Sequence, residues 1–126
     1  TTAPHAVSYP ITSLYNISHG HAVSLTLEKF LKFNFINYRK ASCNFDLKLR
    51  YKSIFNIFGV KNIIELENFF IELKKKAKLE SNFEKLKINL NLNIDKLISG
   101  INLQRLQNNP INLNKKDIKT ILLKSN

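Results

Sequence analysis

The stretch NIIELENFFIELKKKAKL, residues 62–79, has the most regular pattern in this chain. Its apolar residues recur every three or four positions, which is the spacing of one face of an α-helix. Acidic residues stand in the first turns and a lysine run stands in the last turns, so the charges match the helix dipole without any ligand. We therefore predict a helix here, with an apolar stripe made of Ile63, Leu66, Phe69, Phe70, Leu73 and Ala77.

Two further helices follow from the same spacing, and a third follows from a segment that is apolar on nearly every side. One covers about residues 47–58 and ends at Gly59, because glycine is common just beyond a helix C-terminus. The last helix begins after Asn114, with Asp117 three residues on as in a capping box, and turns Ile118, Ile121 and Leu122 toward the core. Residues 22–36 are apolar on nearly every side, so we predict a buried helix that is capped by Ser18 and opens at His19.

The other segments are less regular. We expect Pro10 to limit any helix begun upstream and residues 11–17 to form a connection. Residues 37–44 are polar and basic and are predicted to be a loop. Residues 87–92 are predicted to be an extended connector, residues 94–101 a short helix interrupted by Gly100, and residues 108–110 a turn. The fold class is therefore an all-α helical bundle of five or so helices, one domain over residues 1–126, with no sheet of consequence.

Composition excludes several classes of protein. The single cysteine, Cys43, cannot form an intrachain disulfide, and this favours a reduced, cytoplasmic setting. The longest apolar runs are far too short to span a bilayer, and no signal-peptide pattern opens the chain, so we expect no membrane partner.

The net charge of +11 permits binding to nucleic acid, because lysine and arginine neutralise phosphates. However, Lys, Asn and Ile are abundant together throughout the chain, and most lysines are predicted on helix faces that must be solvated anyway. A basic nucleic-acid-binding module and a helical protein-interaction domain without a site are therefore the alternatives to an enzyme.

The chemically capable side chains gather in the first 23 residues, TTAPHAVSYPITSLYNISHGHAV, which contain all three histidines of the chain: His5, His19 and His21. Neutral imidazole is a good ligand for Fe, Zn, Cu and Ni. Two histidines make an incomplete site, since catalytic metals take three or four protein ligands, and spacing alone does not show that His5 and His19 converge.

The sequence around these histidines resembles the metal-binding signature of the iron-containing alcohol dehydrogenase family. Residues 3–10, Ala-Pro-His-Ala-Val-Ser-Tyr-Pro, are followed fourteen positions after His5 by His19 and Gly20. Ser18 stands where the family usually has a proline. The variant with His-Gly-His-Ala-Val is most similar to the phosphonoacetaldehyde reductase branch, whose members reduce phosphonoacetaldehyde to 2-hydroxyethylphosphonate. Residues 103–110 and the last helix also resemble the end of the family's sequence.

This resemblance implies a fold and a mechanism. The family has an N-terminal α/β domain that binds NAD(P)H and an all-helical, dehydroquinate synthase-like C-terminal domain, with the metal in the cleft between them. The resemblance implies that His5 and His19 are ligands of a divalent metal ion, Fe²⁺ or Zn²⁺, and that this ion polarises the aldehyde oxygen. Many relatives have a histidine at the position of Tyr9 that aids proton transfer, so Tyr9 is the candidate catalytic residue. His21 is either a contact for the phosphonate or a residue with a hydrogen-bonding role.

The chain has no methionine and opens inside this motif. We therefore expect it to be the C-terminal part of a longer, two-domain metal-dependent NAD(P)H-linked aldehyde reductase, in which the missing N-terminal nucleotide-binding domain holds most of the cofactor. The partners implied are that domain and a small phosphonate or aldehyde substrate, and the resemblance also allows a second copy in a homo-oligomer. By itself, the fragment is expected to be inactive and to hold metal weakly.

Overall fold

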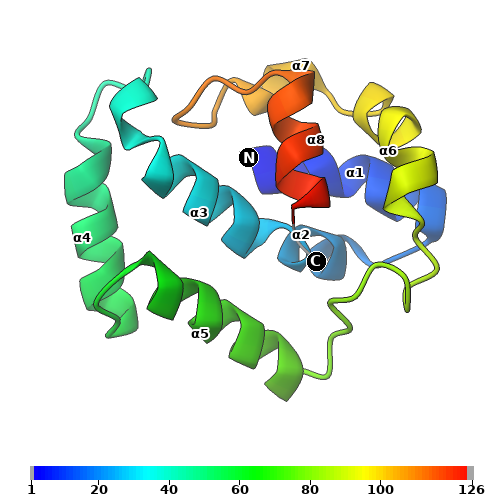
Figure 1. Ribbon diagram of the computed structural model, residues 1–126, viewed down its shortest axis with the longest axis horizontal. Coiled ribbons are helices and arrows are strands. Elements are labelled where there is room, and N and C mark those ends of the chain that lie inside the picture. The colour runs from blue at the N-terminus through cyan, green and yellow to red at the C-terminus, as the bar shows by residue number, and fades with distance from the viewer. Residues whose placement is uncertain (1, 125–126) are drawn as a thin grey trace.

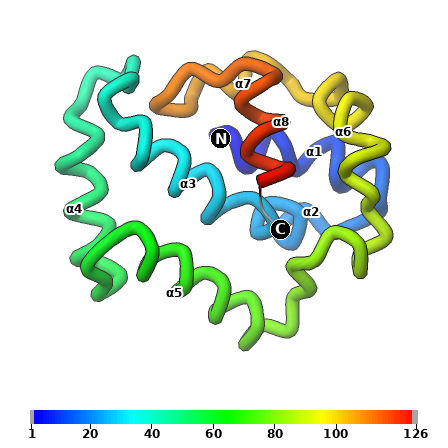
Figure 2. Tube along the Cα trace, viewed as in Figure 1, coloured from blue at the N-terminus to red at the C-terminus, as the bar shows by residue number. Residues whose placement is uncertain are grey.

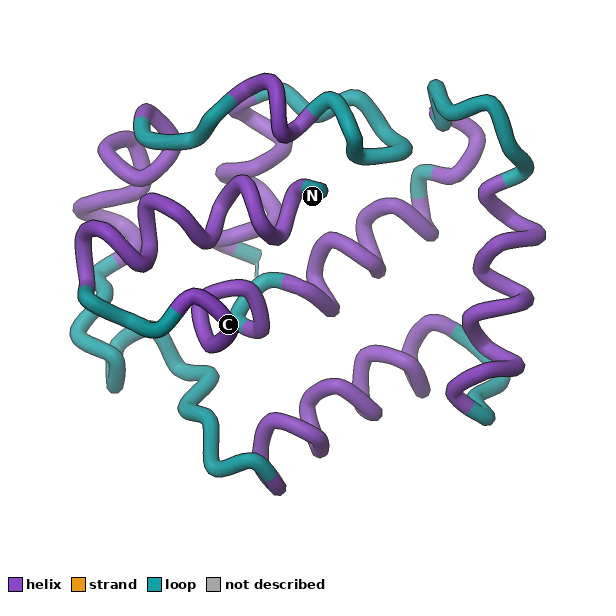
Figure 3. The backbone as a smooth tube through the Cα atoms, turned by 180° about the vertical axis from the view of Figure 1, so that it is seen from behind, coloured by secondary structure: helices purple, strands orange, loops and turns teal. Residues whose placement is uncertain are grey.

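The computed structural model describes residues 2–124, and this part of the chain consists of helices and connecting loops (Figure 3). The predicted all-α fold is confirmed. Eight α-helices and one short 3-10 helix follow one another in the order α1 (Ala3–Tyr15), α2 (His19–Ser24), α3 (Leu27–Ile36), η1 (Tyr38–Lys40), α4 (Leu47–Phe58), α5 (Ile63–Lys76), α6 (Leu90–Ser99), α7 (Leu103–Leu106) and α8 (Lys115–Leu123).

The helices form two groups that meet at α3 (Figure 1). On one side α1 packs against α2, α6 and α7, and α8 packs against α6. On the other side α4 and α5 pack against α3 and against each other, and the trace in Figure 2 shows them as a separate arm of the molecule. Each group has its own cluster of buried apolar side chains, and α3 contributes to both. The histidine-rich N-terminal helices therefore belong to the group with the larger core.

Helix α1 contradicts the prediction that Pro10 would limit a helix. It runs through Pro10 to Tyr15, so residues 11–15 are helical and are not a connection. A proline inside a helix costs about 3 kcal/mol, because a backbone hydrogen bond is lost and the ring meets the preceding turn. Burial offsets this cost here, since Val7 and Ile11 are fully buried and Pro10 itself is buried against Gly100.

The predicted buried helix over residues 22–36 is two helices. α2 ends at Ser24 and α3 starts at Leu27, with the buried Thr26 between them in a non-helical conformation. α3 is also less apolar in its contacts than predicted, because Ile36 is 63% exposed while two polar residues are buried. One of these, Asn34, exchanges hydrogen bonds of 3.0 and 2.9 Å with the buried Asn109 of the 108–110 turn.

Three predicted helices lie close to their predicted positions. α4 ends at Gly59, which has a φ of 66° and thus the left-handed conformation that favours glycine. α5 is capped by Asn62, whose side chain accepts from two backbone N–H groups, and α8 has the predicted capping box of Asn114 and Asp117. The apolar stripe of α5 is only partly buried, however, because Leu73 remains 49% exposed.

The segment after α5 differs from its prediction. Residues 87–89 are an irregular connection, but Leu90 already begins α6, because Asn89 accepts a hydrogen bond from the backbone N–H of Leu92 as an N-cap. Gly100 is the C-cap of α6 and does not interrupt it. The predicted loop at 37–44 contains η1, and within residues 2–124 the β-type pairing is limited to one bridge between Ala41 and Ile111. Within residues 2–124, no helix combines the length and the apolar character of a membrane span.

Candidate functional site

The turn between α1 and α2 brings the two predicted metal ligands together. His5 lies in the first half of α1 and His19 is the first residue of α2, which packs against α1. Their ring centroids are 5.5 Å apart, and the ring planes are tilted by 52°. His19 is exposed and His5 is half-buried, so the pair lies at the edge of the domain where another group can reach both rings.

Ser8, one helical turn after His5, determines which nitrogen of His19 is free. Its side chain is fully buried, and its hydroxyl donates to the His5 carbonyl oxygen at 2.7 Å. The hydroxyl has a single proton, so Oγ can only accept from His19 Nδ1, which lies 3.2 Å away. Nδ1 therefore carries the ring proton, and the lone pair of Nε2 is left available to a metal ion.

The positions of the two rings fit a shared metal ion. Two imidazoles that bind one tetrahedral ion with metal–nitrogen distances of about 2.0–2.1 Å have ring centroids roughly 5 Å apart. The 5.5 Å separation of His5 and His19 is close to this value. Nowhere in residues 2–124 do three or more His, Cys, Asp or Glu side chains group together as metal ligands. The donor set therefore fits part of a metal centre, and further ligands are needed to complete one.

Tyr9 and Arg105 extend the histidine pair into a small cluster. The Tyr9 ring lies 5.1 Å from the His19 ring, centroid to centroid, and the side chain is 42% exposed. The guanidinium carbon of Arg105, from α7, lies 4.1 Å from the Tyr9 ring centroid in a cation–π contact. The structure thus places the predicted catalytic residue beside the predicted ligands, together with a cation from a distant part of the chain.

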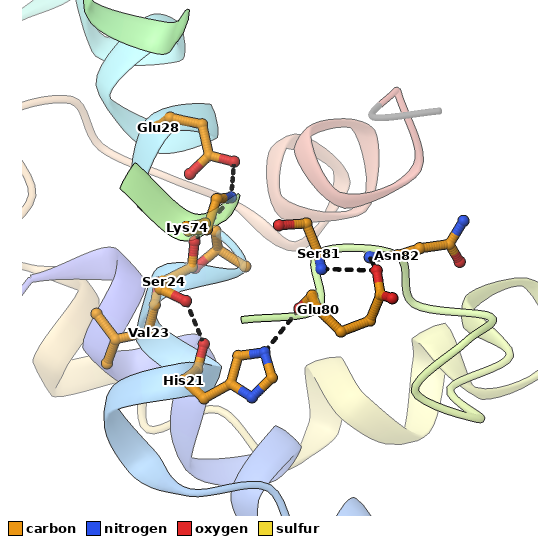
Figure 4. Close-up of polar contacts among 9 residues, drawn as sticks. His21, Val23, Ser24, Glu28, Lys74, Glu80, Ser81 and Asn82 are labelled. Atoms are coloured by element: carbon orange, nitrogen blue, oxygen red, sulfur yellow. Dashed lines mark hydrogen bonds and ion pairs between the residues drawn. The ribbon is translucent and has the colours of Figure 1, made fainter. Parts of the chain in front are cut away.

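The third histidine, His21, makes a separate contact (Figure 4). Its Nε2 lies 2.6 Å from the carbonyl oxygen of Glu80, and because a carbonyl can only accept, Nε2 is the donor. Glu80 belongs to the loop after α5, and its carboxylate accepts from the backbone N–H groups of Ser81 and Asn82. The hydrogen bond from the Asn82 backbone is the main reason why the pKa of the Glu80 carboxyl is lowered. His21 therefore anchors this loop to α2, and its contact with substrate stays a prediction.

A buried ion pair holds α3 against α5 near the same loop (Figure 4). Lys74 Nζ lies 2.5 Å from a carboxylate oxygen of Glu28 and 3.2 Å from the carbonyl oxygen of Ser24, and the side chains of the pair are only 7% and 6% exposed. Lys74 belongs to the lysine run at the end of α5, whose charges complement the helix dipole and whose side chains were mostly predicted to be solvated. It is instead one of the most buried charges in the molecule, and it has a structural role.

Two residues of the cluster were missed at the sequence level, Ser8 and Arg105. Ser8 follows His5 by three positions in a helix, and this spacing places a serine hydroxyl near the carbonyl of the preceding turn. That signal requires residues 5–8 to be helical, and the sequence pattern of this segment did not predict a helix there. Arg105 is far from the histidines in sequence, and only the packing of α7 against α1 places it there.

The comparisons with known proteins give one match. A family model described as Fe-containing alcohol dehydrogenase family, C-terminal, matches residues 1–126. No curated protein and no solved structure matches the chain.

Proposed function

Because this chain belongs to the Fe-containing alcohol dehydrogenase family, we propose that His5 and His19 supply two ligands to the metal centre of a metal-dependent, NAD(P)H-linked alcohol dehydrogenase or aldehyde reductase. The observation that carries this proposal is the convergence of the two rings at 5.5 Å, with Ser8 directing the free nitrogen of His19 outward. The matched family model is that of the C-terminal domain, so we further propose that an N-terminal nucleotide-binding domain supplies the other ligands and the NAD(P)H pocket.

In this proposal each residue of the cluster has a distinct task. His5 and His19 hold the ion, and a divalent ion bound there, Fe²⁺ or Zn²⁺, acts as a Lewis acid on the aldehyde oxygen. Ser8 keeps the ring of His19 in one tautomer and one orientation. Tyr9 is the proposed proton-transfer residue, since its exposed side chain stands beside His19 and a tyrosine hydroxyl can both donate and accept.

The proposed substrate is phosphonoacetaldehyde, which would be reduced to 2-hydroxyethylphosphonate. This part of the proposal is supported by the sequence of residues 1–10 and 19–23, which resembles that of the phosphonoacetaldehyde reductase branch. It is also supported by charge, since a negatively charged phosphonate suits a basic domain of net charge +11. His21 stays a candidate contact for the phosphonate in this scheme.

The proposal is tested by metal content and activity in the complete enzyme that contains this chain. We expect His5→Ala and His19→Ala each to lose most of the bound metal and most of the aldehyde reduction, because each removes one ligand from a site with few ligands. His21→Ala is the matched control for metal content, since its ring is engaged by Glu80, and it should retain the ion. Full metal content in both His5→Ala and His19→Ala would refute the assignment.

A further inference from the structure

Arg105 differs from the other two arginines of the chain in its surroundings. Arg39 and Arg50 are exposed, whereas Arg105 is half-buried and lies over the ring of Tyr9 at 4.1 Å. A guanidinium stays charged at any physiological pH, so this charge is held partly out of water at the edge of the histidine cluster.

This charge has no acidic partner in the described part of the chain. The ion pairs formed within residues 2–124 all use lysine, and the most buried of them joins Lys74 to Glu28. Partly buried charges are normally paired, because the loss of hydration is costly. The stacking on Tyr9 holds the side chain in place, but a cation–π contact leaves the N–H donors of the guanidinium free for an acceptor.

The position of Arg105 relates these donors to the predicted chemistry. Two contacts in series, 4.1 Å from the guanidinium to the Tyr9 ring and 5.1 Å from that ring to the His19 ring, connect Arg105 to the metal ligands. Basic residues in this chain are mostly lysines, with only three arginines among the twenty. Arginine has a planar fork of donors that pairs with two oxygens of a phosphonate or carboxylate, which a lysine ammonium cannot do.

We infer that Arg105 forms an anion-binding subsite beside the His5–His19 pair and holds the negatively charged group of a short substrate whose carbonyl lies toward the histidines. The inference rests on the proposed function and deepens it, because it assigns recognition of the phosphonate to a residue of α7. Arg105 is thus a specificity-determining residue, which selects an aldehyde with a phosphonate group over an uncharged aldehyde of similar size.

A purely structural role for Arg105 makes a different prediction. If the guanidinium only packs α7 against α1, its replacement weakens the domain and affects charged and uncharged aldehydes equally. If it binds the anion, replacement acts on the charged substrate alone. The experiment therefore compares the two kinds of aldehyde in the same variants.

The variants are Arg105→Met, which removes the charge, and Arg105→Lys, which keeps the charge and loses the fork. Arg50→Met is the matched control, because Arg50 also stacks on an aromatic ring, Phe45 at 5.3 Å, on the far helix α4. In the complete metal-loaded enzyme, kcat/KM is measured for phosphonoacetaldehyde and for propanal. Binding of unreactive methylphosphonate is measured by calorimetry.

A charge-assisted hydrogen-bonded pair changes binding by about 10- to 100-fold. We expect Arg105→Met to raise the Kd of methylphosphonate and the KM of phosphonoacetaldehyde by that factor, with propanal reduction, metal content and the unfolding midpoint close to wild type. Arg105→Lys should have a Kd for methylphosphonate and a KM for phosphonoacetaldehyde between those of wild type and Arg105→Met. Arg50→Met should match wild type in both.

Equal losses for propanal and phosphonoacetaldehyde, or an unchanged Kd for methylphosphonate, would overturn the inference. A rise in that Kd in His21→Ala and not in Arg105→Met would also overturn it and assign the anion to His21. Results that would refute the proposed function itself can be told apart from these. In that case metal persists in the His5 and His19 variants or no aldehyde is reduced, while methylphosphonate binding still reports on Arg105 by itself.

Discussion

Ser8 Oγ lies 3.2 Å from Nδ1 of His19, which is eleven residues further along the chain on a different helix. The same hydroxyl donates to the backbone of His5, so one buried serine contacts both predicted metal ligands. This arrangement joins the position of His5 on α1 to the ring orientation of His19 on α2. Such supporting hydrogen bonds fix the tautomer of a ligand and increase its basicity.

Replacing Ser8 by alanine tests this support. Ser8→Ala leaves His19 Nδ1 without its acceptor, so the ring can rotate and change tautomer, and we expect metal affinity to fall by about 10- to 100-fold. Affinity is measured in the complete enzyme by competition with a chelator. Ser13→Ala, an exposed serine on the same helix, is the control and should bind metal as the wild type does. Equal affinity in the two variants would show that Ser8 has no effect on the site.

The buried pair of Glu28 and Lys74 predicts a large effect on stability. Lys74→Met leaves the buried Glu28 carboxylate without its ion-pair partner, which costs about 3–5 kcal/mol. We expect a clear drop in the thermal unfolding midpoint of the enzyme. The double variant Glu28→Leu with Lys74→Met should recover most of it, because both charges of the buried pair are then removed. Lys75→Met, which breaks only the exposed pair with Glu72, should change the midpoint little. A single Lys74→Met variant as stable as wild type would contradict this account.

The lowered pKa of Lys29 predicts that the free energy of unfolding increases at alkaline pH. Burial, with a smaller contribution from the nearby charge of Lys74, lowers the pKa of the Lys29 ammonium from 10.5 to about 8. Below pH 8 the folded protein must hold the charged form, and this costs stability. Between about pH 8 and 10.5 the unfolded chain binds more protons at this residue than the folded one, so the stability contribution of Lys29 rises with pH.

The measurement is the unfolding midpoint of wild type and Lys29→Met from pH 7 to 10.5. Removal of the charge should raise the unfolding midpoint of Lys29→Met relative to wild type most at pH 7, and this difference should shrink toward pH 10.5. Lys76→Met, which removes an exposed lysine of α5, is the control for the loss of one positive charge. A constant difference between Lys29→Met and wild type across this range would show that Lys29 does not titrate as described.

Tyr9 is tested by removing its hydroxyl alone. Tyr9→Phe keeps the ring that contacts His19 and Arg105, so metal content should be retained. If the hydroxyl transfers a proton, kcat for aldehyde reduction should fall by about 100-fold, which is the usual scale of general acid–base catalysis. Tyr15→Phe, on the same helix and packed against the core, should keep its kcat. An unchanged kcat in Tyr9→Phe would exclude the hydroxyl from the chemistry.

The helices that the sequence predicts well are those with local signals at both ends. Asn62 and Asn114 cap their helices through their own side chains, and Gly59 takes the left-handed conformation at a helix end. These interactions span a few residues, so spacing and residue type suffice to predict them. Pro10 shows the opposite case. Its local cost argues against a helix, and only the burial of α1 in the core overrides that cost.

The candidate site divides in the same way. His5 and His19 were found from a motif, but their convergence depends on the turn between α1 and α2. Arg105 joins them only through the packing of α7 on α1, which no local pattern records. The separation of His21 from the cluster likewise follows from its hydrogen bond to Glu80, which is 59 residues away in sequence. Long-range contacts of this kind are set by the tertiary fold.

The most direct test of the central assignment is anomalous X-ray diffraction from crystals of the complete enzyme, recorded above and below the absorption edge of the bound metal. We predict one anomalous peak shared by His5 and His19, about 2.0–2.1 Å from one nitrogen of each ring and facing Nε2 of His19. A fully occupied metal peak that neither imidazole contacts would contradict the assignment.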